Sequence, residues 1–179
     1  MPDYSVMKLK SSREVYRCKL FWVTEDDAVD GNFEIKRSIV RHIGSAVMMA
    51  VDEKQRMLLV RQLRVPAGKR LWELPAGRMD EGETPLQAAK RELREETGYK
   101  AKTWKKLVSY WPSPGFLQEK MTIFLCTDLI AGEAEPMDDE QIECRWFGRA
   151  ELEQMIRAGK IEDGKTITGF MLWRYGAKK

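Results

Sequence analysis

The hydrophobic and polar positions along the chain alternate between short apolar runs and mixed stretches. Continuous apolar runs predict buried strands at residues 45–51 and 57–60, separated by a turn at Lys54-Gln55. The acidic residues 25–27 and the Asp30-Gly31-Asn32 sequence are predicted turns, which makes the stretches on either side a hairpin. Mixed β-branched and aromatic stretches predict the remaining strands at residues 14–23, 33–39, 103–111, 121–128 and 142–147.

Helical spacing is clearest after Thr84. Thr84 is a suitable N-cap, Pro85 suits the first helical position, and Gly98 ends the apolar periodicity. Residues 150–158 predict a second helix that ends before Gly159, and residues 166–175 form a last amphipathic segment. Because strands and helices are interspersed, the pattern indicates an α/β or α+β sandwich.

Length and charge narrow the class of protein. With 179 residues, a single domain is the default expectation. Charged residues make up 33% of the chain, but 31 basic residues nearly balance 28 acidic ones. Nucleic-acid-binding domains concentrate unpaired positive charge, so no nucleic-acid partner is expected.

Cysteine and histidine usage excludes several kinds of site. Cys18, Cys126 and Cys144 are odd in number and widely spaced, which disfavours a disulfide scaffold or a zinc site. His42 is the only histidine, so histidine-based catalysis is not favoured. Neither a signal peptide nor a membrane span is visible, and we expect a soluble protein of the reducing cytoplasm.

Three carboxylates are predicted to share one face of the helix after Thr84. Glu92 lies three residues before Glu95 and four before Glu96. Like charges at this spacing repel, and a divalent cation such as Mg²⁺ would offset that cost. The alternative is a solvated helix whose basic residues neutralise the glutamates, and composition alone favours that alternative.

The spacing of the whole segment favours the metal-binding interpretation over the solvated helix. Gly77 is followed after five residues by Glu83 and after seven more by Arg91-Glu92-Leu93-Arg94-Glu95-Glu96-Thr97-Gly98-Tyr99. This sequence resembles the signature of the Nudix hydrolase family, with Tyr99 where an aliphatic residue is usual. The resemblance implies an α/β/α sandwich with a mixed β-sheet over residues 43–179.

The resemblance also implies roles for individual residues. Glu92, Glu95 and Glu96, with the carbonyl of Ala76, would hold Mg²⁺ or Mn²⁺. Structural roles in the signature would fall to three further residues, namely Glu83, Arg91 and Gly98. Gly77 would let the backbone turn closely at the substrate. Family members hydrolyse a nucleoside diphosphate linked to another group, at the pyrophosphate bond.

The flanking sequence narrows the branch of the family. The strings at 62–64 (QLR) and 71–77 (LWELPAG), with Pro114 sixteen residues after Gly98, resemble the ADP-ribose pyrophosphatase branch. Arg64 and Glu73 would then lie in the substrate cleft, although Glu73 is equally suited to pair with a nearby Arg or Lys. The expected reaction converts ADP-ribose to AMP and ribose 5-phosphate. GDP-mannose and other nucleoside-diphosphate sugars remain alternative substrates.

The general base is expected in the acidic loop at residues 133–143. Glu140 fits the resemblance best, and Glu143 is next. A glutamate with a near-neutral pKa can act as the base because it can take a proton from water. Glu95 is a rival, since signature glutamates serve as the base in some relatives.

The N-terminal residues lie outside the signature. In the resembling branch such strands pair with a second subunit, so residues 1–42 are expected to be a β-hairpin extension that forms a homodimer. Two other functions remain open. A non-catalytic nucleotide-binding domain should have lost signature glutamates, and none is lost here. The other open function is that of a Nudix enzyme with another substrate, such as a dinucleoside polyphosphate, capped RNA or a coenzyme A derivative.

Overall fold

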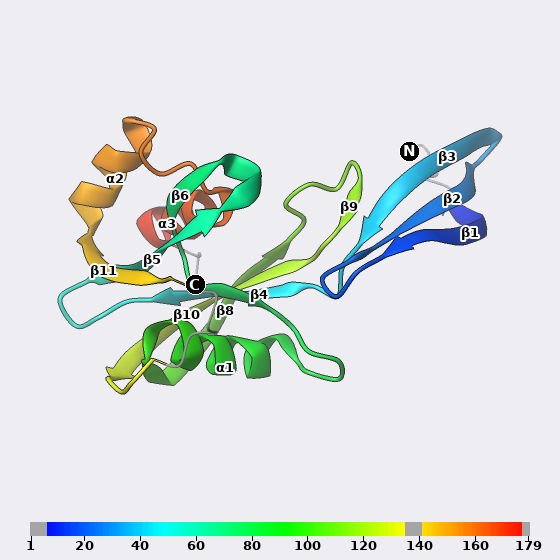
Figure 1. Ribbon diagram of the computed structural model, residues 1–179. Coiled ribbons are helices and arrows are strands. Elements are labelled where there is room, and N and C mark those ends of the chain that lie inside the picture. The colour runs from blue at the N-terminus through cyan, green and yellow to red at the C-terminus, as the bar shows by residue number, and fades with distance from the viewer. Residues whose placement is uncertain (1–6, 135–140, 177–179) are drawn as a thin grey trace. The chain divides into compact units, whose positions relative to one another are not determined.

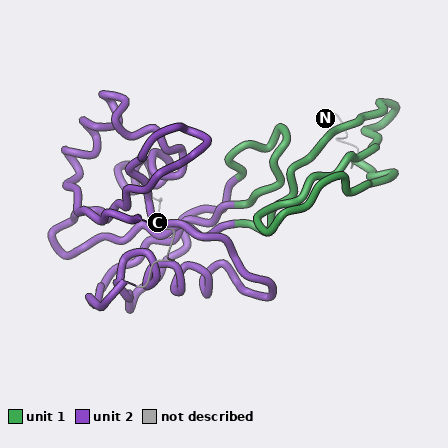
Figure 2. The backbone as a smooth tube through the Cα atoms, viewed as in Figure 1, with its two compact units in different colours: residues 1–44, 111–120 green, residues 45–110, 121–179 purple. Residues whose placement is uncertain are grey.

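The computed structural model describes residues 7–134 and 141–176, and these form two compact units. Unit 1 consists of residues 1–44 and 111–120, and unit 2 of residues 45–110 and 121–179 (Figure 2). Unit 2 contains the three helices α1 (Pro85–Thr97), α2 (Arg149–Arg157) and α3 (Gly164–Tyr175) of the described part, and each unit has its own sheet structure.

Unit 2 is built on two sheets. The first has the order β7-β4-β10-β8, in which β10 is parallel to β4 and the other pairs are antiparallel. The second is antiparallel with the order β11-β5-β6. The strands are β4 (Ser45–Ala50), β5 (Arg56–Arg64), β6 (Lys69–Glu73), β7 (Ala76–Arg78), β8 (Lys100–Tyr110), β10 (Met121–Ile130) and β11 (Glu143–Gly148). A short 3₁₀ turn, η1 (Val65–Ala67), joins β5 to β6.

The alternation along β4 explains why helices cover both faces. Val47 and Met49 point into one core cluster with Leu152 of α2 and Phe170 of α3. Ala46, Met48 and Ala50 point into the other, with Ala88, Ala89 and Leu93 of α1. In unit 2, α1 therefore lies on one side of the strands and α2 and α3 on the other (Figure 1). The predicted α/β/α sandwich with a mixed sheet is confirmed.

The sequence signals at the ends of α1 act as predicted. Thr84 accepts a hydrogen bond from the backbone N–H of Gln87 at 3.3 Å, and Gln87 accepts one from the N–H of Thr84 at 2.9 Å. This reciprocal capping box satisfies two helix-end donors. Gly98 adopts the left-handed conformation with φ 74° and ends the helix.

Unit 1 contains a sheet with the order β1-β2-β3-β9, made of β1 (Lys8–Arg17), β2 (Trp22–Asp30), β3 (Phe33–Arg41) and β9 (Leu117–Gln118). The hairpin of β2 and β3 turns at Gly31-Asn32 as predicted. Two predictions are wrong: residues 25–27 lie inside β2 rather than in a turn, and residues 14–23 are interrupted by a bend at Lys19-Leu20.

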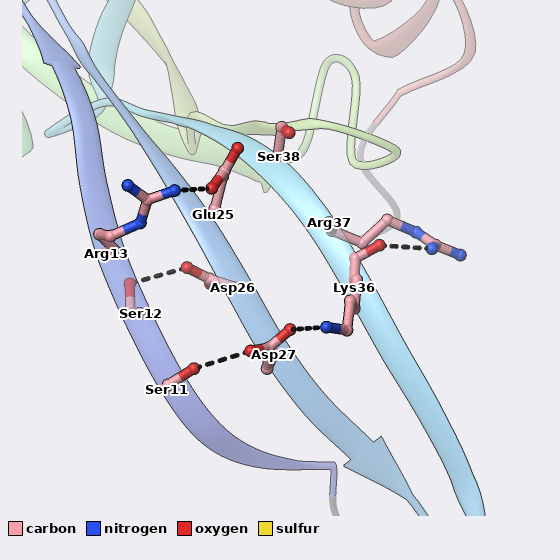
Figure 3. Close-up of a pocket in the computed structure, with 9 residues that line it drawn as sticks. All are labelled: Ser11, Ser12, Arg13, Glu25, Asp26, Asp27, Lys36, Arg37 and Ser38. Carbon is pink, nitrogen blue, oxygen red and sulfur yellow. Dashed lines mark hydrogen bonds and ion pairs between the residues drawn. The ribbon is translucent and has the colours of Figure 1, made fainter.

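Cross-strand pairing explains why an acidic run is extended. Figure 3 shows these carboxylates paired with side chains of the neighbouring strands β1 and β3. Together these residues line a pocket of about 600 Å³. Arg13 pairs with Glu25, and Asp27 lies between Ser11 at 3.0 Å and Lys36 at 3.6 Å. Opposite charges on neighbouring strands stabilise a sheet, and a local sequence pattern does not reveal them.

Asp26 is the buried member of this run, and we expect Asp26→Asn to destabilise unit 1 by roughly 3 kcal/mol at neutral pH. Asp26 pairs with Arg41, its side chain is 6% exposed, and Ser12 donates to it at 2.7 Å. Burial alone would raise the pKa of Asp26, but hydrogen bonds from Ser12 and Thr24 and the charge of Arg41 together lower it. A lowered acid pKa stabilises the fold above the unfolded pKa, about 3.9, and this contribution is lost as the pH falls further.

Urea unfolding followed by tryptophan fluorescence at pH 7 and pH 3 measures this effect. The difference between wild type and Asp26→Asn should shrink at pH 3. The matched control is Asp27→Asn, whose side chain is 47% exposed and should change stability by only about 0.5 kcal/mol. Equal losses for both variants would contradict the role of the buried pair.

Candidate active site

The signature residues gather where α1 packs against β7 in unit 2. The clearest contact joins Gly77 of β7 to Glu92 of α1. A Cβ atom placed on Gly77 would lie 1.9 Å from Glu92 Cδ and 2.1 Å from its Oε1. Gly77 is therefore required for close approach of this carboxylate rather than for an unusual backbone angle. This contact places the first residue of the signature beside the helix face that carries its glutamates.

Arg91 is the centre of the acidic cluster. Its Nη1 donates to Glu92 Oε1 at 2.6 Å and to Glu95 Oε2 at 3.1 Å. Its Nη2 donates to Glu83 Oε2 at 2.9 Å and to the carbonyl of Arg78 at 3.0 Å. These bonds raise the pKa of Arg91, and the hydrogen bond from Arg91 lowers the pKa of Glu83. Arg91 and Glu83 are therefore ionised at neutral pH, and Arg91 offsets part of the repulsion among the carboxylates.

Glu96 occupies a different position on the same helix. It is 6% exposed, and its Oε2 accepts a hydrogen bond from the N–H of Ala76 at 3.2 Å. This contact ties the C-terminal half of α1 to the start of β7. It also brings together two of the residues expected to bind metal.

The donor chemistry of this cluster suits a hard divalent cation, because carboxylate and carbonyl oxygens are the ligands such cations prefer. Across residues 7–134 and 141–176, no three His, Cys, Asp or Glu side chains converge as a metal-binding group. The Arg91 guanidinium instead bridges Glu83, Glu92 and Glu95. The missing Cβ of Gly77 gives Glu92 its place on β7. The residues therefore fit the expected cation in the chemistry of their oxygen donors.

Arg64 and Glu73 form a bidentate pair. Arg64 Nε donates to Glu73 Oε1 at 2.7 Å, and Nη2 donates to Oε2 at 3.0 Å. The Arg64 side chain is 40% exposed, whereas that of Glu73 is 1% exposed. Arg64 thus remains accessible to a ligand, and the contacts of Glu73 match the alternative interpretation of a partner for a nearby cation. Glu73 also has a second cationic partner, Lys165, which the sequence did not single out.

Of the three candidates for general base, Glu95 and Glu143 are among the described residues. Glu140, the first choice, lies outside the described residues. Glu143 begins β11, is exposed, and has its Oε2 3.5 Å from Arg61 Nη1. Glu95 lies in the Arg91 cluster with its side chain 32% exposed.

Comparison with known proteins identifies the family. The model of the NUDIX domain matches residues 40–168, and the chain belongs to the Nudix family of hydrolases. The ADP-ribose pyrophosphatase of Mycobacterium tuberculosis is 34% identical over 165 residues, covering 90% of this chain and 80% of that protein. The GDP-mannose pyrophosphatase of Cronobacter sakazakii is 33% identical over 134 residues, covering 69% of each.

A solved structure agrees on the fold. The crystal structure of an ADP compounds hydrolase superposes with a TM-score of 0.80 at 22% identity, covering 98% of this chain and 96% of that one. In the described part of the chain, none of the helices has the length and apolar character needed to span a membrane.

Proposed function

We propose that the protein is a metal-dependent pyrophosphohydrolase that cleaves the diphosphate of ADP-ribose to AMP and ribose 5-phosphate. The observation that carries this proposal is the similarity to an ADP-ribose pyrophosphatase over 90% of the chain. The full set of signature glutamates supports turnover rather than binding alone. The GDP-mannose pyrophosphatase relative favours a second candidate, hydrolysis of GDP-mannose or another nucleoside-diphosphate sugar.

The side chains suggest a division of labour. Glu92, Glu95 and Glu96, with the Ala76 carbonyl, would hold Mg²⁺ or Mn²⁺. Such a cation supplies Lewis-acid chemistry to the phosphate oxygens. Arg91 orients the carboxylates, and the Arg64 guanidinium, whose Nη1 lies outside its fork with Glu73, suits a phosphate oxygen. A glutamate base then takes a proton from the attacking water while one P–O bond of the diphosphate breaks.

A substrate panel tests the function. Wild-type protein with Mg²⁺ is offered ADP-ribose, GDP-mannose, ADP-glucose, NADH and diadenosine polyphosphates, and phosphate is measured after phosphatase treatment. We expect the highest kcat/KM for ADP-ribose. A higher value for GDP-mannose would favour the second candidate, and no cleavage in the whole panel would favour a binding domain.

Glu140 is the proposed general base, and we expect Glu140→Gln to lower kcat by roughly 100-fold or more. Removing a proton acceptor changes the chemical step rather than ground-state binding, so KM should stay within a few-fold. Glu143→Gln is the matched variant from the same acidic segment. If Glu143→Gln or Glu95→Gln alone lowers kcat in this way, the base is that residue instead.

A homodimer formed through residues 1–42, with residues 43–179 as the catalytic domain, also belongs to the proposal. β1 is the edge strand of its sheet and is exposed along its whole length. Leu9 and Tyr16 on it are 53% and 55% exposed, and exposed apolar edges pair readily with other chains. With its three cysteines free of disulfides, the protein is expected to work in the cytoplasm, without nucleic-acid or membrane partners.

If the protein is a dimer, sedimentation of the wild type should give a mass of twice 20.8 kDa. Leu9→Ser should weaken the dimer by about tenfold or more, since it removes apolar area from the interface. Met171→Ser is the control, because it removes an apolar side chain of similar exposure from α3 of unit 2. A monomeric wild type, or the same shift in the control, would contradict the assignment.

A further inference from the structure

Glu73 is a buried carboxylate held by two cations from different parts of the chain. Arg64 occupies both of its oxygens from β5, and Lys165 Nζ of α3 donates to Oε2. Glu73 and Lys165 are 1% and 7% exposed. A buried carboxylate loses its hydration and needs hydrogen-bonding partners in its place, so the pair of cations fixes the orientation of Glu73.

Lys165 is itself fixed at the first turn of α3. Asp163 accepts from Lys165 Nζ at 3.0 Å and caps the helix by accepting from the N–H of Thr166 at 2.9 Å. Thr166 Oγ1 in turn accepts from the N–H of Leu74 at 2.7 Å. Two polar contacts therefore join the start of α3 to the consecutive residues Glu73 and Leu74.

The helix also packs closely on this segment. A Cβ atom on Gly169 would lie 2.6 Å from Leu74 Cδ1. Leu74 is fully buried and is followed by Pro75, Ala76 and Gly77. The segment at residues 73–77 is thus held by α3 through Leu74 and by α1 through Ala76 and Gly77.

Arg64 is the exposed end of this network. Glu73 uses its Nε and Nη2, which leaves Nη1 outside the fork. Burial would lower the pKa of Arg64, but the hydrogen bond and charge of Glu73, with the charges of Glu96 and Asp163, raise it. Arg64 therefore stays charged within electrostatic reach of Glu96 in the signature helix.

We propose that Glu73 and Lys165 are positioning residues that aim the Arg64 guanidinium at the substrate diphosphate, so that α3 controls substrate affinity. The assignment of Arg64 to the diphosphate rests on the proposed function. The NUDIX domain match ends at residue 168, inside α3, and the signature itself covers neither Lys165 nor Glu73.

The first test uses NMR to detect the position of the Arg64 side chain in the absence of substrate. The Arg64 Nε–H resonance, assigned by its loss in Arg64→Met, reports the fork with Glu73. Lys165→Met should shift or broaden this resonance, because Glu73 then retains one cation. Lys165→Arg should restore it, and Lys160→Met is the control on an exposed lysine. An unchanged resonance in folded Lys165→Met overturns the proposal; if that variant does not fold, Lys165→Gln, which keeps a donor, takes its place.

The second test is a double-mutant cycle on ADP-ribose hydrolysis. Lys165→Met should raise KM about tenfold, the effect of misaligning one charge-assisted hydrogen bond, with kcat within about threefold. If Lys165 acts through Arg64, adding Lys165→Met to Arg64→Met should change KM no further, whereas independent effects would multiply and overturn the proposal. A wild type that leaves ADP-ribose intact would overturn the proposed function only, since the resonance still decides the positioning.

Discussion

Replacing Glu96 by glutamine is expected to abolish metal-dependent turnover in a protein that remains folded. Glu96 is 6% exposed and accepts a hydrogen bond from the N–H of Ala76. The glutamine carbonyl keeps that bond and the volume of the side chain, but the negative charge is lost. Since residues that merely support metal ligands cost about 10- to 100-fold when changed, loss of a ligand should cost more than roughly 100-fold.

Three measurements check this expectation. The rate of ADP-ribose cleavage with Mg²⁺ should fall, calorimetric titration with Mn²⁺ should show weaker binding, and the melting temperature should change by only a few degrees. Glu81→Gln makes the same change on an exposed glutamate of the loop before α1 and should leave all three as in the wild type. Activity of Glu96→Gln within a few-fold of wild type would remove Glu96 from the metal site.

Local signals were sufficient to predict the framework around this helix. The Thr84 cap, Pro85 and Gly98 define α1, and the apolar runs define β4 and part of β5. Each signal acts within a few residues of the chain, so sequence reasoning reaches it. The error at residues 25–27 has the opposite origin, because their stability in β2 depends on partners in β1 and β3.

The same distinction between local and long-range contacts applies to the candidate active site. The spacing of the signature predicted that Glu92 and Glu96 share one face of a helix, because helix geometry alone brings residues four apart together. Lys165 was not predicted, since it reaches Glu73 across 92 residues of sequence through the packing of α3. Its only local sign is its place after Asp163, a cap residue, at the start of an otherwise apolar segment.

Gly77→Ala is the second large expected effect, and it separates activity from stability. The new Cβ would lie 1.9 Å from Glu92 Cδ, so the carboxylate must move by more than 1 Å to reach ordinary contact distance. Glu92 is the flexible partner and leaves its place, because the backbone of β7 is paired with β4. A misplacement of about 1 Å in a catalytic constellation can cost roughly 100-fold in rate. The contacted atoms are the far end of a flexible side chain, which can relax without disturbing the pairing of β7.

Gly77→Ala should therefore fold with a melting temperature within a few degrees of wild type and lose about 100-fold in kcat/KM for ADP-ribose. Gly148→Ala is the matched control, since that glycine precedes α2 with φ −72° and open space around its Cα. The pair of variants isolates the contact with Glu92, because both add one methyl group at a backbone angle that alanine tolerates. Wild-type activity in Gly77→Ala would mean that the position of Glu92 against β7 does not matter for the reaction.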